Sequence, residues 1–107
     1  MDKVLNLLGL ARRSGHLIIG TDSVISSMQQ GKVNLILLAS DASTNTIDKL
    51  IKKAYFYQIE VVTSYDASSL QQATGSKTLV YALNDAGFAK AIQKEINLRK
   101  VGDQNEG

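Results

Sequence analysis

The sequence of 107 residues contains no cysteine, a single histidine and no apolar run long enough to cross a membrane. The lack of cysteine excludes disulfide bonds, thiolate nucleophiles and cysteine-based zinc sites. With His16 alone and no tight cluster of acidic residues, we expect neither a metal site nor another cofactor. The first residues also lack the basic, apolar and small-residue segments of a secretory leader. We therefore expect a soluble, cytoplasmic protein that makes no membrane contact.

The composition is that of an ordinary globular domain. Apolar residues make up 44% of the chain and charged residues 21%, and the length suits one domain with a sizeable core. The formal net charge is +2, which favours a polyanionic partner only slightly. The placement of the cations therefore matters more than their sum.

Apolar residues recur at helical spacing in five segments and form short, nearly continuous runs in four others. Helices are expected over 4–13, from Gly20 to Gly31, around 47–54, over 66–74 and from Asn84 or Asp85 to Ile96. Strands are expected over 17–19, 33–39, 59–63 and 78–83. This alternation predicts an α/β fold, a three-layer α/β/α sandwich with a small mixed four-stranded sheet. We expect one domain over residues 1–98 and a flexible polar tail over 99–107.

Catalytic groups are scarce. A serine nucleophile needs a histidine base and an acid to orient it, and the only candidate base is His16, which follows a glycine at a helix end. The simpler interpretation of His16 is a partly exposed side chain at a helix terminus. The glycine-rich loops that bind nucleotide phosphates are also absent, so the protein is not expected to be an enzyme.

The beginning of the second helix is a candidate binding site. Gly20, Thr21, Asp22 and Ser23 are small or polar, and a helix start presents unpaired N–H groups with a partial positive charge. The alternative is purely structural: Thr21 or Asp22 caps the helix and Gly20 permits a tight turn. The basic segments ARRSGH and KLIKKA have an equally simple alternative as solvated cationic faces.

Several segments, in order and spacing, carry a resemblance to a known family. They are LLGLARRSGHLIIG, GKVNLILLASDASTNT, TGSK and VYALNDAGFAKAI. The chain resembles the kink-turn RNA-binding ribosomal proteins of the L-seven-Ae and L-thirty-e type, in particular the small bacterial YlxQ-type members, from Val4 to about Ile96. This resemblance implies an α/β/α sandwich that grips kinked RNA with the start of the second helix and nearby loops.

The resemblance also shows where this chain departs from the family. Members commonly have Gly-x-Asn-Glu at the helix start and a lysine three residues after the glutamate. Here the glycine is Gly20, the two readers of purine edges are replaced by Asp22 and Ser23, and Ser26 stands in place of the lysine. Asp22 accepts but cannot donate a hydrogen bond, Ser23 is short, and Ser26 removes one ion pair to the RNA backbone.

The candidate RNA-binding residues implied by the resemblance include the helix start, the loop after the central strand, the TGSK loop and nearby cations. They are Gly20, Thr21, Asp22, Ser23, Ser26, Lys32, Ser40, Asp41, Thr74, Gly75, Ser76, Lys77, Arg12 and Arg13. The expected function is non-catalytic binding of kinked, structured RNA by a ribosomal or translation-associated protein. We expect a monomer and leave membership of the ribosome open. The alternative is a family-fold protein-interaction module whose RNA binding is weak or lost.

Overall fold

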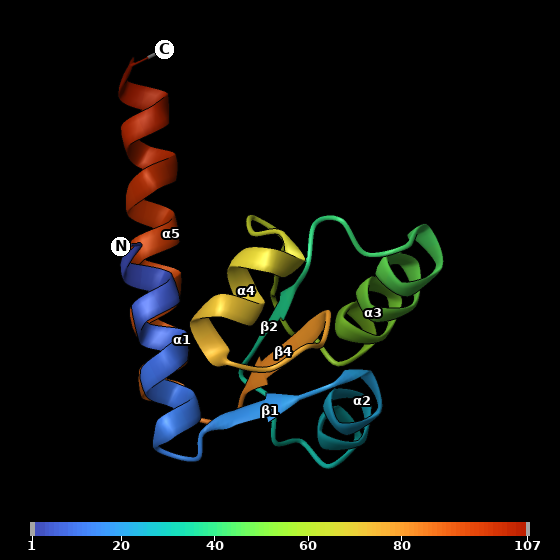
Figure 1. Ribbon diagram of the computed structural model, residues 1–107. Helices are drawn as coiled ribbons and strands as arrows, with labels where there is room; N and C mark the ends of the chain where they lie inside the picture. Colours follow the sequence, from blue (N-terminus) through green and yellow to red (C-terminus); the bar gives the residue numbers. More distant parts are fainter. Residues whose placement is uncertain (1, 107) are drawn as a thin grey trace.

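The computed structural model describes residues 2–106, and the side chains of residues 2–99. Five helices and four strands alternate along this part of the chain (Figure 1). The helices are α1 (Lys3–Arg13), α2 (Thr21–Gln29), α3 (Thr44–Phe56), α4 (Ala67–Thr74) and α5 (Ala86–Glu106). The strands are β1 (Leu17–Ile19), β2 (Leu35–Leu38), β3 (Val61–Val62) and β4 (Val80–Leu83). The expected elements are all present, although β2, β3 and β4 are shorter than the apolar runs that predicted them.

The four strands form one mixed sheet in the order β1-β4-β2-β3. Strand β4 pairs antiparallel with β1 and with β2, with Ala82 opposite Ile18 on one side and opposite Ile36 on the other. Strand β2 pairs parallel with β3, and α3 makes the crossover between them. The structure therefore confirms the predicted small mixed sheet.

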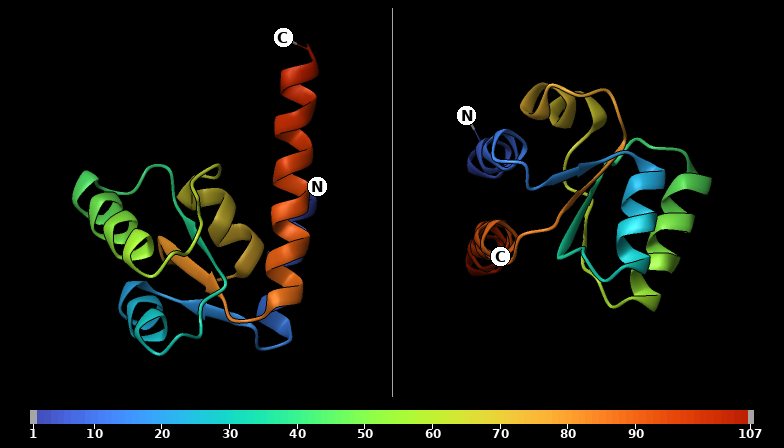
Figure 2. Two further views of the ribbon diagram at one scale, coloured as in Figure 1. Left: turned by 180° about the vertical axis from the view of Figure 1, so that it is seen from behind. Right: turned by 90° about the horizontal axis from the view of Figure 1, so that it is seen from below.

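Helices cover both faces of this sheet, as Figure 2 shows from below, where α1, α4 and α5 lie on one side and α2 and α3 on the other. Every residue of β2 and β4 is buried, and successive residues face opposite layers. Leu35 and Leu37 pack in the core with α1, α4 and α5, whereas Ile36 and Leu38 pack in the core with α2 and α3. The continuous apolarity of β2 follows from this double burial, and the three-layer α/β/α sandwich is confirmed.

Side chains cap four of the five helix starts. Asp2 accepts from the amides of α1, Ser43 from that of Thr46 in α3, and Asp66 from that of Ser69 in α4. Asp85 accepts from the Phe88 amide at 2.9 Å, so of the two expected caps for α5 it is Asp85 that serves. Helix α2 differs, as described below.

Helices α1 and α2 end alike, each at a glycine with left-handed backbone. Gly15 has φ 79° and Gly31 has φ 72°. The Gly15 amide donates to the Arg12 carbonyl and the His16 amide to that of Ala11, and the same pair of bonds follows α2. Glycine suits this position because a left-handed backbone strains residues that carry a side chain.

A polar network joins the first helix, the β3–α4 connection and the last helix. Arg99 Nη2 donates to Asp2 Oδ1 at 3.0 Å, and the Tyr65 hydroxyl donates to the same carboxylate at 3.0 Å. Partial burial alone would raise the pKa of Asp2, but the hydrogen bonds from Arg99, Tyr65 and the helix amides outweigh it and lower the pKa. The carboxylate is therefore charged in the folded protein at neutral pH.

Helices α3 and α5 each differ in one respect from the pattern of the sequence. The helical spacing of Ile47, Leu50, Ile51 and Ala54 predicts that Ile51 faces inward from α3, but Ile51 is 45% exposed, because Leu50 and Ala54 already fill the contact with the sheet. Helix α5 continues to Glu106, so most of the segment 99–107 belongs to a helix. The flexibility expected for that segment stays a prediction, and residue 107 lies outside the described residues.

Candidate nucleic-acid interface

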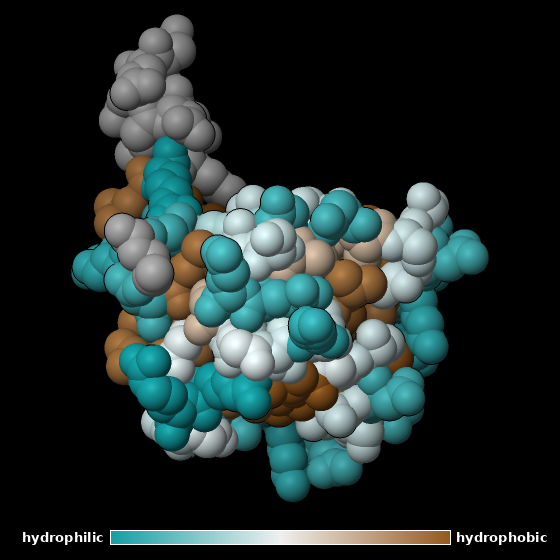
Figure 3. Space-filling model, viewed as in Figure 1, coloured by the Kyte–Doolittle hydropathy of each residue, from teal (hydrophilic) through white to brown (hydrophobic). Residues whose placement is uncertain are grey.

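The strand directions bring several loops to one edge of the sheet. Strand β1 ends and β4 begins there, because they are antiparallel and the Gly20 amide donates to the Val80 carbonyl at 3.0 Å. Strand β2 ends at the same edge, where the Ala39 amide donates to the Leu79 carbonyl at 2.9 Å. The start of α2, the β2–α3 loop and the α4–β4 loop therefore share this edge. On the face in Figure 3, polar and neutral residues surround smaller apolar patches.

The start of α2 has no side-chain cap. Its N-cap residue is Gly20, with φ 100° and ψ 150°, a backbone conformation that is essentially restricted to glycine. The expectation that Thr21 or Asp22 caps the helix is therefore wrong, because both already belong to its first turn. A helix start without a capping side chain keeps first-turn amides available to another acceptor.

The α4–β4 loop is fixed from beneath by core residues. The Tyr81 ring is fully buried, and its hydroxyl donates to the carbonyls of Ser76 at 2.8 Å and Thr78 at 3.3 Å. Arg12 Nη1 donates to the Thr74 carbonyl at 2.9 Å, which ties α1 to the end of α4. Gly75 has φ 72° and provides the turn out of α4. The loop is thus held in one shape beside the start of α2.

Thr74, which sequence reasoning placed among the binding residues, is buried in the structure. Its hydroxyl donates to the Leu70 carbonyl at 2.8 Å within α4. The side chain is therefore used inside the protein, whereas Gly75 and Lys77 are exposed. Of the TGSK segment, the glycine, serine and lysine remain as candidates.

Ser40 and Asp41 lie at the same edge and contact the beginning of α4. The Ser40 amide donates to the Tyr65 carbonyl at 2.9 Å, and Asp41 Oδ1 accepts from the Ala67 amide at 2.8 Å. In the order of the sheet, β4 lies between β2, which leads into this loop, and β1, which leads into α2. Asp41 therefore supports the start of α4, and the RNA contact expected of Ser40 and Asp41 stays a prediction.

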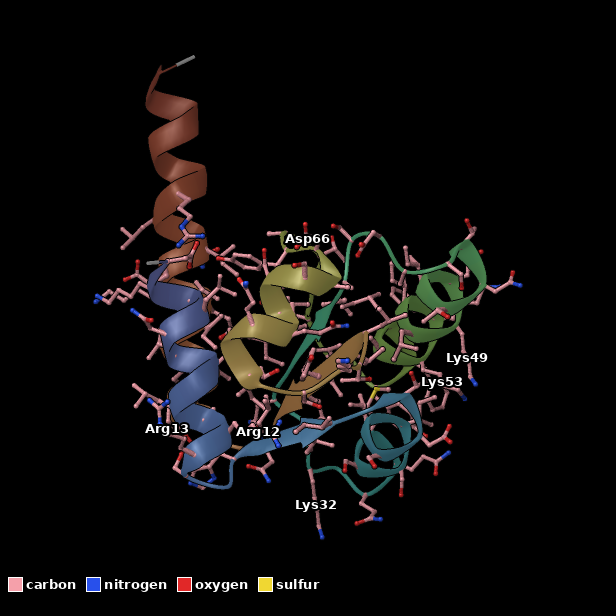
Figure 4. The ribbon with its side chains drawn as sticks, viewed as in Figure 1. Arg12, Arg13, Lys32, Lys49, Lys53 and Asp66 are labelled. Carbon is pink, nitrogen blue, oxygen red and sulfur yellow. The ribbon has the colours of Figure 1, made fainter. Side chains whose placement is uncertain are left out.

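Three of the four expected cations lie on α1 or the α4–β4 loop, and the fourth lies beyond the end of α2 (Figure 4). Arg12 contacts the end of α4, and Arg13 lines a groove of about 240 Å³ between α1 and α4. Lys77 is exposed on the loop that leads to Val80. Lys32 instead follows the end of α2, about 13 Å along the helix axis from its start. The structure does not bring Lys32 together with the start of α2.

Sequence reasoning did not identify two residues that hold the α4–β4 loop in place, Tyr81 and Gln71. Tyr81 and Gln71 both donate to the Thr78 carbonyl, from the core and from α4. A tyrosine within the apolar run of β4 is the signal, because a buried tyrosine hydroxyl needs an acceptor within reach.

Comparison with known families decides the relationship of the chain. A model described as "Ribosomal protein L7Ae/L30e/S12e/Gadd45 family" matches residues 2–93. The chain belongs to this family. It is 33% identical to a protein of Enterococcus faecium named "RNA-binding protein YlxQ", covering 88% of this chain and 91% of the relative. A Bacillus subtilis (strain 168) protein of the same name is 33% identical, and the alignment covers 80% of this chain and 87% of the relative. These matches confirm the resemblance to YlxQ-type members.

Solved structures confirm the family fold. A structure titled "The structure of a protein with unknown function from Bacillus halodurans C" superposes with a TM-score of 0.87 and 37% identity, covering 91% of this chain and 99% of that one. A second, titled "Giardia lamblia 15.5kD RNA binding protein", has a TM-score of 0.76 at 15% identity, with coverage of 94% and 91%. The second similarity concerns the fold alone.

Proposed function

We propose that this protein binds structured RNA with the start of α2 and the α4–β4 loop. The observation that carries the proposal is the α2 start without a side-chain cap, beside a loop that holds an exposed lysine. The family membership and the names of the YlxQ relatives support the same function. The RNA class that suits the site best is kinked RNA, because a standard A-form major groove is too narrow for side chains to read.

The roles follow from the chemistry of each group. Amides at the α2 start and the helix dipole attract a phosphate or the acceptor atoms of a base. Gly20 has no side chain, and nothing else lies within 4 Å of where one would begin, so RNA can approach the backbone closely. Lys77 and Arg12 supply phosphate contacts that position the RNA without reading its sequence.

Asp22, Ser23 and Ser26 are exposed at or near this start and define how the RNA is read. An aspartate at the helix start suits the dipole and accepts from base amino groups, but it repels phosphates. Ser26 accepts a hydrogen bond from Gln30 Nε2 at 3.3 Å within α2. We propose that these residues weaken or redirect recognition compared with members that carry asparagine, glutamate and lysine.

The proposed action is binding without catalysis, as a cytoplasmic monomer associated with translation. His16 lies at the α1–β1 turn, with Nδ1 3.3 Å from Asn84 Oδ1, away from the proposed site. No three histidine, aspartate or glutamate side chains within the described residues come together to hold a metal ion. In the same part of the chain, no helix has the length and apolarity to cross a bilayer.

Titration with a kinked RNA and a straight duplex of equal length tests the proposal. The kinked RNA should bind more tightly, with an affinity that falls as salt rises. Lys77→Ala should weaken binding and reduce the salt slope by about 1, whereas Lys90→Ala, an equal charge change on exposed α5, should not. Equal affinity for both RNAs, or equal effects of the two substitutions, would contradict the site.

A triple variant tests the reading positions. Asp22→Asn, Ser23→Glu and Ser26→Lys together should strengthen binding to kinked RNA, because they restore a donor, a longer acceptor and a cation. If affinity stays unchanged, the surface is not arranged as proposed. Recovery of a protein partner after nuclease treatment, without RNA affinity, would instead support the interaction module.

A further inference from the structure

The end of α3 exposes two aromatic rings to solvent. Tyr55 is 86% exposed and Phe56 is 76% exposed, which makes them the most exposed large hydrophobic side chains among the described residues. Phe56 also meets Tyr57 edge to face, with ring centroids 4.9 Å apart and planes at 88°. Neither exposed ring contributes to the two cores, so the fold does not require aromatic residues at these positions.

These rings border a hollow that has a polar side. Tyr55 and Phe56 line a cavity of about 760 Å³ together with Lys52, Gln58 and Glu60. Because both rings are largely exposed, this is an open hollow on the surface rather than an enclosed pocket. The cavity thus presents aromatic faces, an amide, a cation and the Glu60 carboxylate to one ligand.

The backbone at Gln58 is the second observation that points to a ligand. Among the described residues, Gln58 is the only non-glycine residue with positive φ, at 58°. Its amide donates to the Tyr55 carbonyl at 3.1 Å, and the Ile59 amide donates to the Ala54 carbonyl at 2.8 Å. This is the ending that α1 and α2 complete with glycine. A strained residue that keeps its side chain in a cavity is typical of a functional position.

The charges around the rings favour a polyanion over a protein surface. Helix α3 carries three lysines within two turns, Lys49, Lys52 and Lys53, against one acidic residue, Asp48. Figure 4 shows Lys49 and Lys53 on the same side of the helix. Lysine is depleted in the buried parts of protein interfaces, whereas exposed rings beside cations are the usual platform for unpaired bases. Glu60, the acidic residue of the cavity, accepts a hydrogen bond from Gln93 Nε2 at 3.0 Å.

We propose that the end of α3 is a second nucleic-acid contact, which stacks unpaired RNA bases on Tyr55 and Phe56 and holds their phosphates with the α3 lysines. Gln58 would donate or accept at the base edge within the cavity. Because β2 and β3 are parallel, α3 ends at the sheet edge opposite the start of α2. The two contacts are therefore separate, and this one goes beyond the binding of kinked RNA.

Fluorescence anisotropy with labelled single-stranded oligonucleotides of about eight residues tests the proposal. Oligo(A) should bind more tightly than oligo(U), because purines stack better. The double variant Tyr55→Ala/Phe56→Ala should lose about tenfold or more in affinity. Tyr55→Phe/Phe56→Tyr, which keeps both rings, should bind as the unchanged protein does. Leu98→Ala, at an apolar side chain that is 55% exposed on α5, should have no effect.

A spectroscopic readout locates the contact, and a second variant separates the two sites. The ring proton resonances of Tyr55 and Phe56 should shift upfield on addition of oligo(A). Lys77→Ala should leave oligo(A) affinity unchanged while it weakens binding to kinked RNA. Failure of kinked RNA binding alone would therefore not affect this proposal.

Two results would overturn it. One is equal oligo(A) affinity in the double alanine variant and the unchanged protein. The other is self-association in sedimentation experiments that the double variant abolishes, without any effect of that variant on oligonucleotides. The second result would assign the rings to contact between copies of the chain.

Discussion

Gly20 and Gln58, at opposite edges of the sheet, reverse the usual residue choice at helix ends. Helix starts favour a side chain that caps, as Asp2, Ser43 and Asp66 do here, yet α2 starts at Gly20. Helix ends with left-handed backbone favour glycine, yet α3 ends at Gln58. One position gives up a stabilising side chain, and the other keeps a side chain at the expense of strain.

The difference indicates what each edge is built for. Removing the side chain at Gly20 leaves backbone amides open to a ligand that approaches the main chain. Keeping the side chain at Gln58 places an amide group beside exposed rings, where a ligand contacts side chains. The first edge therefore suits a rigid, folded RNA, and the second suits bases that are free to stack.

The largest effect is expected at Gly20. Gly20→Ala should destabilise the protein by about 2 kcal/mol, because φ 100° with ψ 150° is essentially closed to residues with a β-carbon. Nothing lies within 4 Å of the added atom, so the cost is conformational rather than steric. Urea unfolding measures it. Gly75→Ala, at φ 72° and ψ 21°, is the matched control and should cost less, about 1 kcal/mol. Equal losses would show that the Gly20 backbone is not unusually restricted.

Replacing Asp2 converts the capped start of α1 into an uncapped one. Asp2→Ala should cost about 1 to 2 kcal/mol, because it removes the α1 cap and the partner of Arg99. Asp2→Asn keeps the cap and should cost less. Chemical denaturation of both variants at neutral pH gives the comparison. A loss for Asp2→Asn as large as for Asp2→Ala would mean that the carboxylate charge matters more than the cap.

The strain at Gln58 can be released. Gln58→Gly should stabilise the protein by about 1 kcal/mol, since glycine adopts φ 58° without strain. For a domain of this size, that is a rise of roughly 4 to 8 °C in Tm, measurable by thermal melting. An unchanged or lower Tm would show that the Gln58 side chain stabilises the fold rather than serving a ligand.

The smallest effect is a dependence on pH. The pKa of Asp2 is lowered from 3.8 in the folded protein, so the carboxylate stabilises the fold above about pH 4 and this contribution is lost as pH falls through the lowered pKa. The stability difference between the unchanged protein and Asp2→Asn should therefore be constant near neutral pH and shrink in acid. Unfolding at pH 2 to 7 checks this, and a difference that grew in acid would contradict it.

Much of the fold follows from local sequence patterns. Apolar spacing predicted each helix and strand, and the continuous run in β2 predicted burial on both faces. The strand order has no such signal, because it depends on pairing between distant segments such as β1 and β4. Ile51 has the spacing of a core residue, but spacing does not show that Leu50 and Ala54 already fill the contact.

The candidate site was predicted in part. Gly20 and the α4–β4 loop meet as the resemblance implied, but Lys32 lies beyond the far end of α2 and Thr74 is buried. Local sequence does not show whether the Thr74 hydroxyl faces solvent or the helix backbone. It also does not show that Lys32 lies at the end of α2 that is away from the site. The exposure of Tyr55 could not be predicted from the sequence either, because an aromatic residue in a helix is usually at least partly buried.

The exposed residues at the α2 start lie outside both cores, and this has an evolutionary consequence. Asp22, Ser23 and Ser26 are exposed, so substitutions there remove no core packing. A lineage can therefore exchange these residues one at a time and acquire a new RNA preference without passing through an unfolded intermediate.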